Sequence, residues 1–392
     1  MNNRLKVFLI FVSLSGLFTC VDPFTPKLND FQSLLVVDAL LTDENRSDCV
    51  TLTKTKKNAQ DTDEKVCWAT VIIKDDLGNS EVLTERRPGS YYTDSLRFRG
   101  EVGRTYTLSI KTAEGNEYES LPCLMLPAQD LDSVYYAKAD QILNNEIKGG
   151  ISIYVHSRSD GQPRYYRWTY EELWKFNLTL GKEYNYLGNG NFAPCDVKNV
   201  SCYKGNRSRE ILIGESNKDF SANLVFIPSD ITDRLTDIYR IRVRQLSISE
   251  KEYNFWHEMK LIAENGGDIF DKQPFQITGN IFNKKNSAEK VLGYFQVSSA
   301  TEKRLYVTVN EIKKMGLPIY TSNCEPFALD KSVLPASSNP SWDEVYRFAT
   351  LYGFVFLYPV YDDTGSFLVS MMFAEPECAD CTTTGTATVA DF

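Results

Sequence analysis

Histidine is nearly absent from this sequence, which holds only His156 and His257, far apart along the chain. Neither belongs to a ligand cluster such as His-Glu-x-x-His, and catalytic triads and histidine-rich zinc sites both depend on this residue. Gly-x-Ser-x-Gly, a phosphate-binding glycine-rich loop and a dinucleotide fingerprint are also missing. We therefore expect no enzymatic activity, no cofactor and no metal site.

A basic surplus is missing as well, because the net charge is -9. Nucleic-acid binders need cationic side chains to displace phosphate counterions, so we expect no nucleic-acid partner. No apolar run near ~18 residues follows residue 19, so no transmembrane helix is predicted. What is present suits a globular protein: 42% of the residues are hydrophobic, with 22 Tyr and 22 Phe to build cores.

Cys20 is the most informative residue that the chain does contain. A basic head with Arg4 and Lys6 precedes an apolar stretch at 7–18, which is typical of a secretory signal. A cysteine directly after such a leader indicates a bacterial lipobox, whose thiol is acylated and becomes the new N-terminus. We predict a signal peptide at 1–19, lipidation of Cys20 and an anchoring linker at 20–30. The alternative is an ordinary signal peptide cut nearby, with Cys20 as a plain thiol.

The remaining cysteines favour disulfides, because they are even in number in an exported chain. Spacing suggests a loop staple between Cys195 and Cys202, and a bridge across a hairpin between Cys49 and Cys67. The other four are Cys123, Cys324, Cys378 and Cys381.

Cys378 and Cys381 form a Cys-x-x-Cys pair, which can indicate redox chemistry or zinc. No strand-to-helix unit follows the pair, and no second ligand pair stands at metal spacing. We therefore interpret it as structural, with one of the two cysteines joined to Cys324.

The hydrophobic pattern predicts a mainly β fold in two domains. Short runs of β-branched residues, such as 69–73 and 105–110, recur about every ten residues over 31–128 and indicate an immunoglobulin-like β-sandwich. A larger β-rich domain is expected over 129–392. It contains one prominent helix at 250–265, where Ser249 and Glu252 make a capping box before an apolar stripe. Residues 340–349 suggest a shorter helix.

Aromatic side chains are the candidates for ligand binding. Tyr166, Trp168 and Tyr170 share one face of a predicted strand, and Trp174 follows them. Such rings can form a platform for a sugar or a peptide, or they can fill a core. The segment 175–203 is rich in Asn and Gly and reads as a surface excursion that Cys195–Cys202 would pin. Glu171 and Glu172 are a carboxylate pair, but the sequence cannot place them across a glycosidic bond.

Several segments together carry a family resemblance. They are Cys-Val-Asp-Pro-Phe at 20–24, then 34–43, 165–168, 242–249, 266–270, 277–281, 291–295, and the ending with Cys378, Cys381, Gly385 and Asp391-Phe392. With these segments the chain resembles Bacteroidota outer-membrane lipoproteins that carry the domain of unknown function 4249. The resemblance implies an outer-membrane location and a TonB-dependent barrel as partner. The single Asp22 after Cys20 leaves the cell surface and the periplasmic face equally open.

The sequence thus predicts a non-enzymatic, lipid-anchored accessory subunit of a TonB-dependent transporter that captures or gates a ligand, a glycan or a peptide. One alternative is a structural or assembly protein of the cell envelope. A surface glycan hydrolase that uses carboxylates alone is the other.

Overall fold

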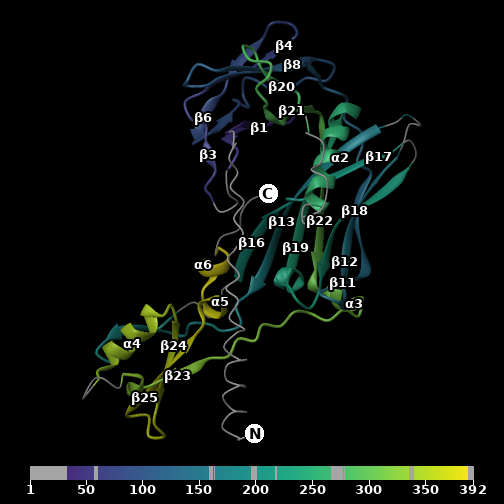
Figure 1. Ribbon diagram of the computed structural model, residues 1–392. Coiled ribbons are helices and arrows are strands. Elements are labelled where there is room, and N and C mark those ends of the chain that lie inside the picture. The colour runs from purple at the N-terminus through teal and green to yellow at the C-terminus, as the bar shows by residue number, and fades with distance from the viewer. Residues whose placement is uncertain are drawn as a thin grey trace, which may run out of the picture.

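The computed structural model describes residues 33–56, 61–158, 162, 164–195, 201–216, 219–265, 277, 279–334 and 340–386. The predicted signal peptide, Cys20 and the linker 20–30 lie outside the described residues, so lipidation stays a prediction. The described chain is mainly β with few helices, as predicted (Figure 1). Within these ranges no helix has the length and apolar composition needed to cross a membrane.

Two sheets form what we call the N-terminal unit. One sheet has the order β21 (Leu292–Ser298), β1 (Leu35–Thr42), β2 (Cys49–Lys54), β7 (Ser90–Tyr92) and β6 (Thr84–Arg87), with β3 (Glu64–Lys65) beside β2. The other has the order β20 (Ile281–Asn283), β9 (Glu117–Ser120), β8 (Thr105–Lys111), β4 (Thr70–Asp75) and β5 (Ser80–Val82), with β10 (Cys123–Leu124) beside β8.

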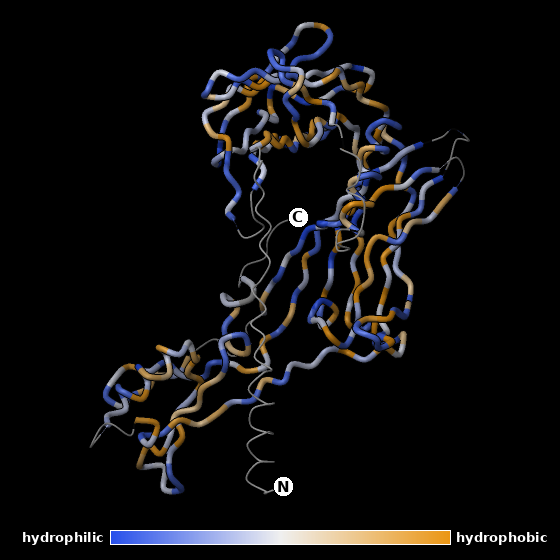
Figure 2. The backbone as a smooth tube through the Cα atoms, viewed as in Figure 1, coloured by the Kyte–Doolittle hydropathy of each residue, from blue (hydrophilic) through white to orange (hydrophobic). Residues whose placement is uncertain are grey.

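Both sheets contribute to one core, as the predicted sandwich requires. Val37 and Leu52 come from the first sheet, Ile73 and Leu108 from the second, and all four are fully buried in the same cluster. Alternation explains this, because every second side chain of a strand points to the same face. Hydrophobic residues accordingly follow the strands in Figure 2. The immunoglobulin-like strand arrangement remains a prediction.

The division at residue 128 is wrong in one respect, because β20 and β21 complete the N-terminal unit from residues 281–298. Figure 1 shows both strands in green among purple and blue ones. β21 runs parallel to β1, from the pair Val36 and Leu292 to the pair Thr42 and Ser298. Gly293 permits this close approach: its φ is +96°, and a Cβ there would lie 1.9 Å from the Val37 carbonyl oxygen. The chain therefore returns to its first unit after building another.

Two further sheets make the central unit. A three-stranded sheet has the order β11 (Ser133–Leu143), β12 (Glu146–Ser157) and β18 (Phe220–Pro228). It shares a core with a sheet in the order β16 (Ser201–Arg207), β13 (Arg164–Asn177), β19 (Ile238–Ile248) and β22 (Ala300–Thr308), with β17 (Leu212–Ser216) beside β13. The 3-10 turn η2 (Asp233–Leu235) precedes β19, and α3 (Val309–Lys314) follows β22.

Helix α2 (Glu250–Asn265) confirms the predicted helix and packs near β13 and β17. The Ser249 hydroxyl accepts a hydrogen bond from the Glu252 backbone N–H at 3.2 Å, as an N-cap should. The Glu252 carboxylate, however, accepts from the Trp256 indole N–H at 3.2 Å. The second half of the predicted capping box is therefore replaced by a bond to the next turn.

A smaller unit, which we call the C-terminal lobe, contains two sheets. They are β23 (Phe327–Leu329), β25 (Leu368–Ala374) and β24 (Val355–Tyr361) in that order, and the hairpin β14 (Tyr184–Gly188) with β15 (Asn191–Pro194). Helix α4 (Trp342–Leu351) covers their common core and has its own capping box, with Ser341 and Glu344. It confirms the shorter predicted helix. The turn η3 (Lys331–Val333) and the short helices α5 (Pro376–Ala379) and α6 (Cys381–Thr384) complete the described chain.

The segment 175–203 is not the surface excursion that we predicted. Its first residues finish β13 and its last ones begin β16. Between them, Tyr184, Tyr186 and Phe192 pack against the core of the C-terminal lobe. This segment therefore supplies a hairpin to a unit whose other strands come from the end of the chain.

Candidate functional site

One cavity lies where the central unit meets the C-terminal segments and has a volume of about 550 Å³. Four parts of the chain line it: the end of β13 with β16, the turn around η2, residues 320–324, and the helix α5. The lining residues are Phe176, Asn177, Leu178, Thr179, Lys204, Asp233, Thr236, Tyr320, Thr321, Ser322, Asn323, Cys324, Glu377 and Cys378. This size falls within the range of small-ligand pockets.

One wall carries an ion pair that is satisfied within the protein. The Lys204 Nζ lies 2.6 Å from an Asp233 carboxylate oxygen, and the other oxygen accepts from the Trp174 indole at 2.9 Å. The Lys204 ammonium also lies 4.4 Å from the centroid of the Phe176 ring. Lys204 and Asp233 therefore neutralise each other, and the ring is already occupied by a cation.

The opposite wall is residues 320–324 of what we call the extended segment, residues 317–326, which links α3 to β23 without helix or strand. It is the long connection between those two labels in Figure 1. The Tyr320 N–H donates to the Ser229 carbonyl at 2.9 Å. The hydroxyls of Ser322 and Thr179 are hydrogen-bonded, which brings the two walls together at one end of the cavity.

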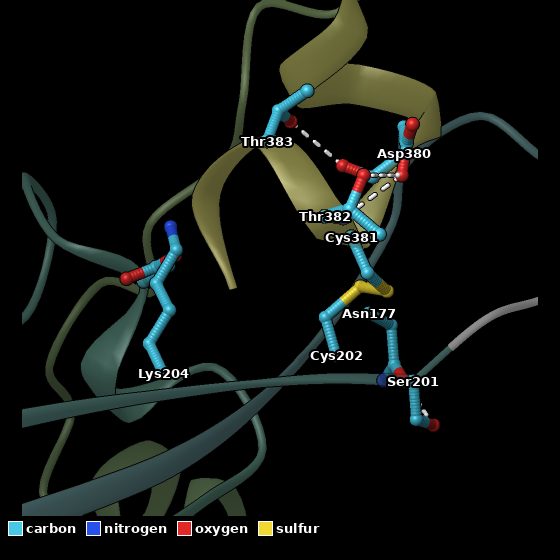
Figure 3. Close-up of a disulfide and its surroundings, with 9 residues drawn as sticks. Asn177, Ser201, Cys202, Lys204, Asp380, Cys381, Thr382 and Thr383 are labelled. Carbon is cyan, nitrogen blue, oxygen red and sulfur yellow. Dashed lines mark hydrogen bonds and ion pairs between the residues drawn. A yellow bond between two sulfur atoms is a disulfide. The ribbon is translucent and has the colours of Figure 1, made fainter. Parts of the chain in front are cut away.

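Two disulfides fix this region, and both end on the short helices α5 and α6. Cys324 is bonded to Cys378 and Cys202 to Cys381, with Cα atoms 5.7 Å and 5.4 Å apart. Figure 3 shows the second bridge, with Asn177 and Ser201 on the central-unit side. The Ser201 hydroxyl donates to the Asn177 side-chain oxygen at 2.9 Å. The Cys324–Cys378 bridge therefore lies in the cavity lining, and the Cys202–Cys381 bridge ties the helix that follows it to β16.

The disulfides revise the sequence-based pairing. The interpretation of Cys378 and Cys381 as structural is supported, since one of them joins Cys324. The predicted staple between Cys195 and Cys202 is wrong, because Cys202 is buried in β16 opposite Cys381 and Cys195 is free. Cys195 directly follows β15, which belongs to the C-terminal lobe, whereas Cys202 belongs to the central unit. The two thiols therefore lie in different units although they are close in sequence.

The predicted bridge between Cys49 and Cys67 is wrong too, and both thiols are free, as is Cys123. β2 pairs with β3 only at Thr53 and Lys54 and then pairs with β7, which places Tyr92 opposite Cys49.

The four aromatic ligand-binding candidates prove to be core residues. Tyr166, Trp168, Tyr170 and Trp174 are 1%, 2%, 4% and 8% exposed, because β13 runs inside its sheet and this face is covered by the β11–β12–β18 sheet. A ring with no accessible face cannot stack on a ligand, so this interpretation is wrong.

Glu171 and Glu172 point to opposite faces of β13. Glu171 pairs with Arg242, whereas Glu172 is buried and accepts from the Tyr239 hydroxyl at 2.7 Å and the Asn206 amide at 3.0 Å. Neighbouring residues of a strand always diverge in this way. The two carboxylates are thus separated by the sheet and do not form a hydrolytic pair. Over the part of the chain that the structure describes, no group of three or more metal-ligating side chains is found.

A buried ionic cluster lies apart from the cavity, where α2 meets the N-terminal unit. The Arg167 guanidinium lies 3.8 Å from the Trp256 ring centroid and donates to the Gln296 side-chain oxygen at 2.6 Å. Glu252 is only 3% exposed, and burial raises the pKa of its carboxyl to about 8, against an opposing effect of Arg167. The cluster joins β13, α2 and β21, and we assign it to packing between units.

Sequence reasoning missed the residues that line the cavity. Lys204 and Asp233 look like ordinary surface charges, and the extended segment carries no motif. The one usable signal was Cys324, since a cysteine that pairs with the C-terminal end must hold its neighbours close to it. The cavity itself depends on contacts between residues more than a hundred positions apart.

The model of a family described as domain of unknown function (DUF4249) matches residues 21–304. This span covers most of the chain. The chain belongs to the DUF4249 family. No curated protein matches the sequence. The DUF4249 match includes the N-terminal unit and most of the central unit, and it ends within β22. The extended segment and the cysteines at 324, 378 and 381 lie beyond it, so one wall of the cavity is built from residues outside the family match.

Proposed function

We propose that this DUF4249 chain is a non-enzymatic lipoprotein of the outer membrane, an accessory subunit that captures a ligand for a TonB-dependent transporter. The observation that carries the proposal is the cavity of about 550 Å³ with the Cys324–Cys378 disulfide in its lining. Preformed, covalently fixed pockets bind with little loss of conformational entropy.

The chemistry of the lining favours binding. Amide and hydroxyl groups of Asn177, Thr179, Thr236 and Ser322 surround the cavity, and the ion pair between Lys204 and Asp233 is satisfied internally. Such groups orient a ligand through hydrogen bonds. The anchoring part of the proposal depends on Cys20 and its leader, as the sequence pattern indicates.

A pull-down from gently solubilised native membranes, with the full chain tagged at an exposed site, tests the transporter role. We expect one TonB-dependent barrel in near one-to-one stoichiometry. Recovery of the chain alone, or with a scattered set of envelope proteins, would contradict the proposal and favour a structural role. Metabolic labelling with a fatty acid tests the anchor separately: label should enter the native chain, and the variant Cys20→Ser should remain unlabelled.

A further inference from the structure

The wall of the cavity formed by residues 321–324 has the geometry of an uncovered strand. Thr321 and Asn323 are exposed, while Ser322 and Cys324 are half-buried, so exposure alternates with the period of an extended chain. Tyr320 just before them is tied to Ser229, and Cys324 is bonded to Cys378. Both ends of this short stretch are therefore fixed in place.

The backbone of this stretch has no partner among the described residues. Neither a strand pairing nor a backbone hydrogen bond involves the N–H or C=O groups of 321–324 in those parts of the chain. Each such residue offers one donor and one acceptor that must otherwise be satisfied by water. Four residues in extended conformation span about 13 Å. The stretch is thus a short template for another strand.

The backbone of residues 321–324, unpaired among the described residues, favours a peptide over a glycan, because strand addition needs a partner backbone. Sugars are commonly bound by stacking on an open aromatic face, and the aromatic surface here is limited: Phe176 is 7% exposed with the Lys204 ammonium over its ring, and Tyr320 is half-buried. The side chains that remain are neutral amides and hydroxyls, such as Asn177 and Thr236, together with the exposed carboxylate of Glu377. They suit backbone amides and small polar side chains, and the Glu377 carboxylate disfavours an acidic ligand.

We propose that the cavity binds a short peptide segment without acidic side chains, in extended conformation, which pairs through its backbone with residues 321–324. This is recognition by strand addition, in which main-chain hydrogen bonds give affinity and flanking side chains give selectivity. The inference rests on the proposed function, in that it takes the cavity as the ligand site, and it names the class of ligand.

The experiment compares two kinds of substitution at the same positions. Asn323→Pro and Ser322→Pro each remove a backbone N–H, whereas the matched controls Asn323→Ala and Ser322→Ala remove the side chain and keep the N–H. Successive N–H groups of an extended chain point to opposite sides, so one of the two proline variants should lose a bond to the ligand. The probes are a library of capped, uncharged hexapeptides and, as the competing class, maltohexaose.

We expect the mature chain to select hexapeptides and to ignore maltohexaose. One proline variant should bind the selected peptides about tenfold more weakly, the effect of losing one hydrogen bond at the upper end of its usual range. Each alanine control should bind the selected peptides more tightly than the matched proline variant that loses the bond, because it keeps the N–H, and N-methylation of alternate peptide bonds in the ligand should abolish binding. Mass mapping of both disulfides and an unchanged melting temperature serve to show that each variant is folded.

Three results would overturn the inference: binding of maltohexaose but of no peptide, proline variants that bind as well as their alanine controls, or N-methylated peptides that bind normally. Failure here is distinct from failure of the proposed function. A barrel that co-purifies with a chain that binds no peptide contradicts only the ligand class. Peptide binding without any barrel contradicts only the transporter role.

Discussion

The N-terminal unit and the C-terminal lobe differ in how each is held together. Among the described residues, the N-terminal unit buries a cluster of twenty hydrophobic side chains and contains no disulfide. The C-terminal lobe has a central cluster of only four, Ala349, Phe356, Met371 and Phe373, and two disulfides tie the short helices that follow β25 to the extended segment and to β16. Small units bury a smaller fraction of their surface, so they more often need covalent support.

The comparison shows that the two regions are stabilised by different interactions. The described part of the N-terminal unit is stabilised by buried apolar surface without a disulfide, at roughly 25 cal/mol per Å² of that surface. The region around the cavity has little such area, and its walls come from distant parts of the chain. The disulfides supply the missing constraint at the place where the proposed ligand binds.

The largest expected effect comes from removing both bridges, with the substitutions Cys324→Ser and Cys202→Ser. Each loss should lower the free energy of unfolding by about 2–5 kcal/mol, because each bridge closes a long loop. Hydrogen exchange followed by mass spectrometry should show faster exchange in β24, β25 and α4. Exchange in β1 and β8 should stay unchanged. Uniform destabilisation of both regions would contradict the distinction drawn between them.

Phe295→Ala should destabilise the N-terminal unit by about 3–5 kcal/mol, because this fully buried ring of β21 fills the first core. The matched control is Phe356→Ala, which removes a buried ring from the C-terminal lobe. Hydrogen exchange should rise around β1 and β2 in the first variant and around β24 in the second. If Phe295→Ala left β1 and β2 protected, the assignment of β21 to the N-terminal unit would be wrong.

A smaller effect is expected from Glu252, and it depends on pH. Its carboxyl is ionised above about pH 4.5 in the unfolded chain, but burial raises its pKa to about 8 in the folded one. The folded state therefore binds more protons across this window, and the free energy of unfolding falls as the pH rises from about 4.5 to about 8. Glu252→Gln removes this titration, so it should match the native chain at pH 4.5 and exceed it by of the order of 2 kcal/mol at pH 8.5.

Denaturant titrations at both pH values measure this difference. The matched control is Glu250→Gln, two residues earlier at the exposed start of α2. It should leave the pH dependence as it is. Equal pH profiles for the native chain and Glu252→Gln would show that the Glu252 carboxyl does not cause the pH dependence of the free energy of unfolding.

The smallest effect should come from the free thiols. Cys67→Ser is expected to change the free energy of unfolding by less than about 0.5 kcal/mol, since Cys67 has no disulfide partner. Alkylation under denaturing, non-reducing conditions should label Cys49, Cys67, Cys123 and Cys195 and spare the other four described cysteines. Labelling of Cys202 together with protection of Cys195 would restore the pairing that spacing suggested.

Local patterns of the sequence were enough to predict much of the secondary structure. The helix at 250–265 follows from Ser249 and the apolar stripe, and the strands of the N-terminal unit follow from alternation, because these signals act between residues a few positions apart. The signature of export and lipidation at 1–20 is likewise local and remains independent of the described fold.

The tertiary structure alone decided the partners of these elements. It placed β21 beside β1, put Tyr166 and Trp168 into a core, joined Cys202 to Cys381 across 179 residues and formed the cavity against residues 320–324. Each of these outcomes depends on which apolar faces cover one another, and a face of a strand looks the same in sequence whether a sheet or a ligand covers it. The sequence determined what the elements are, and burial between distant elements determined which residues a ligand can reach.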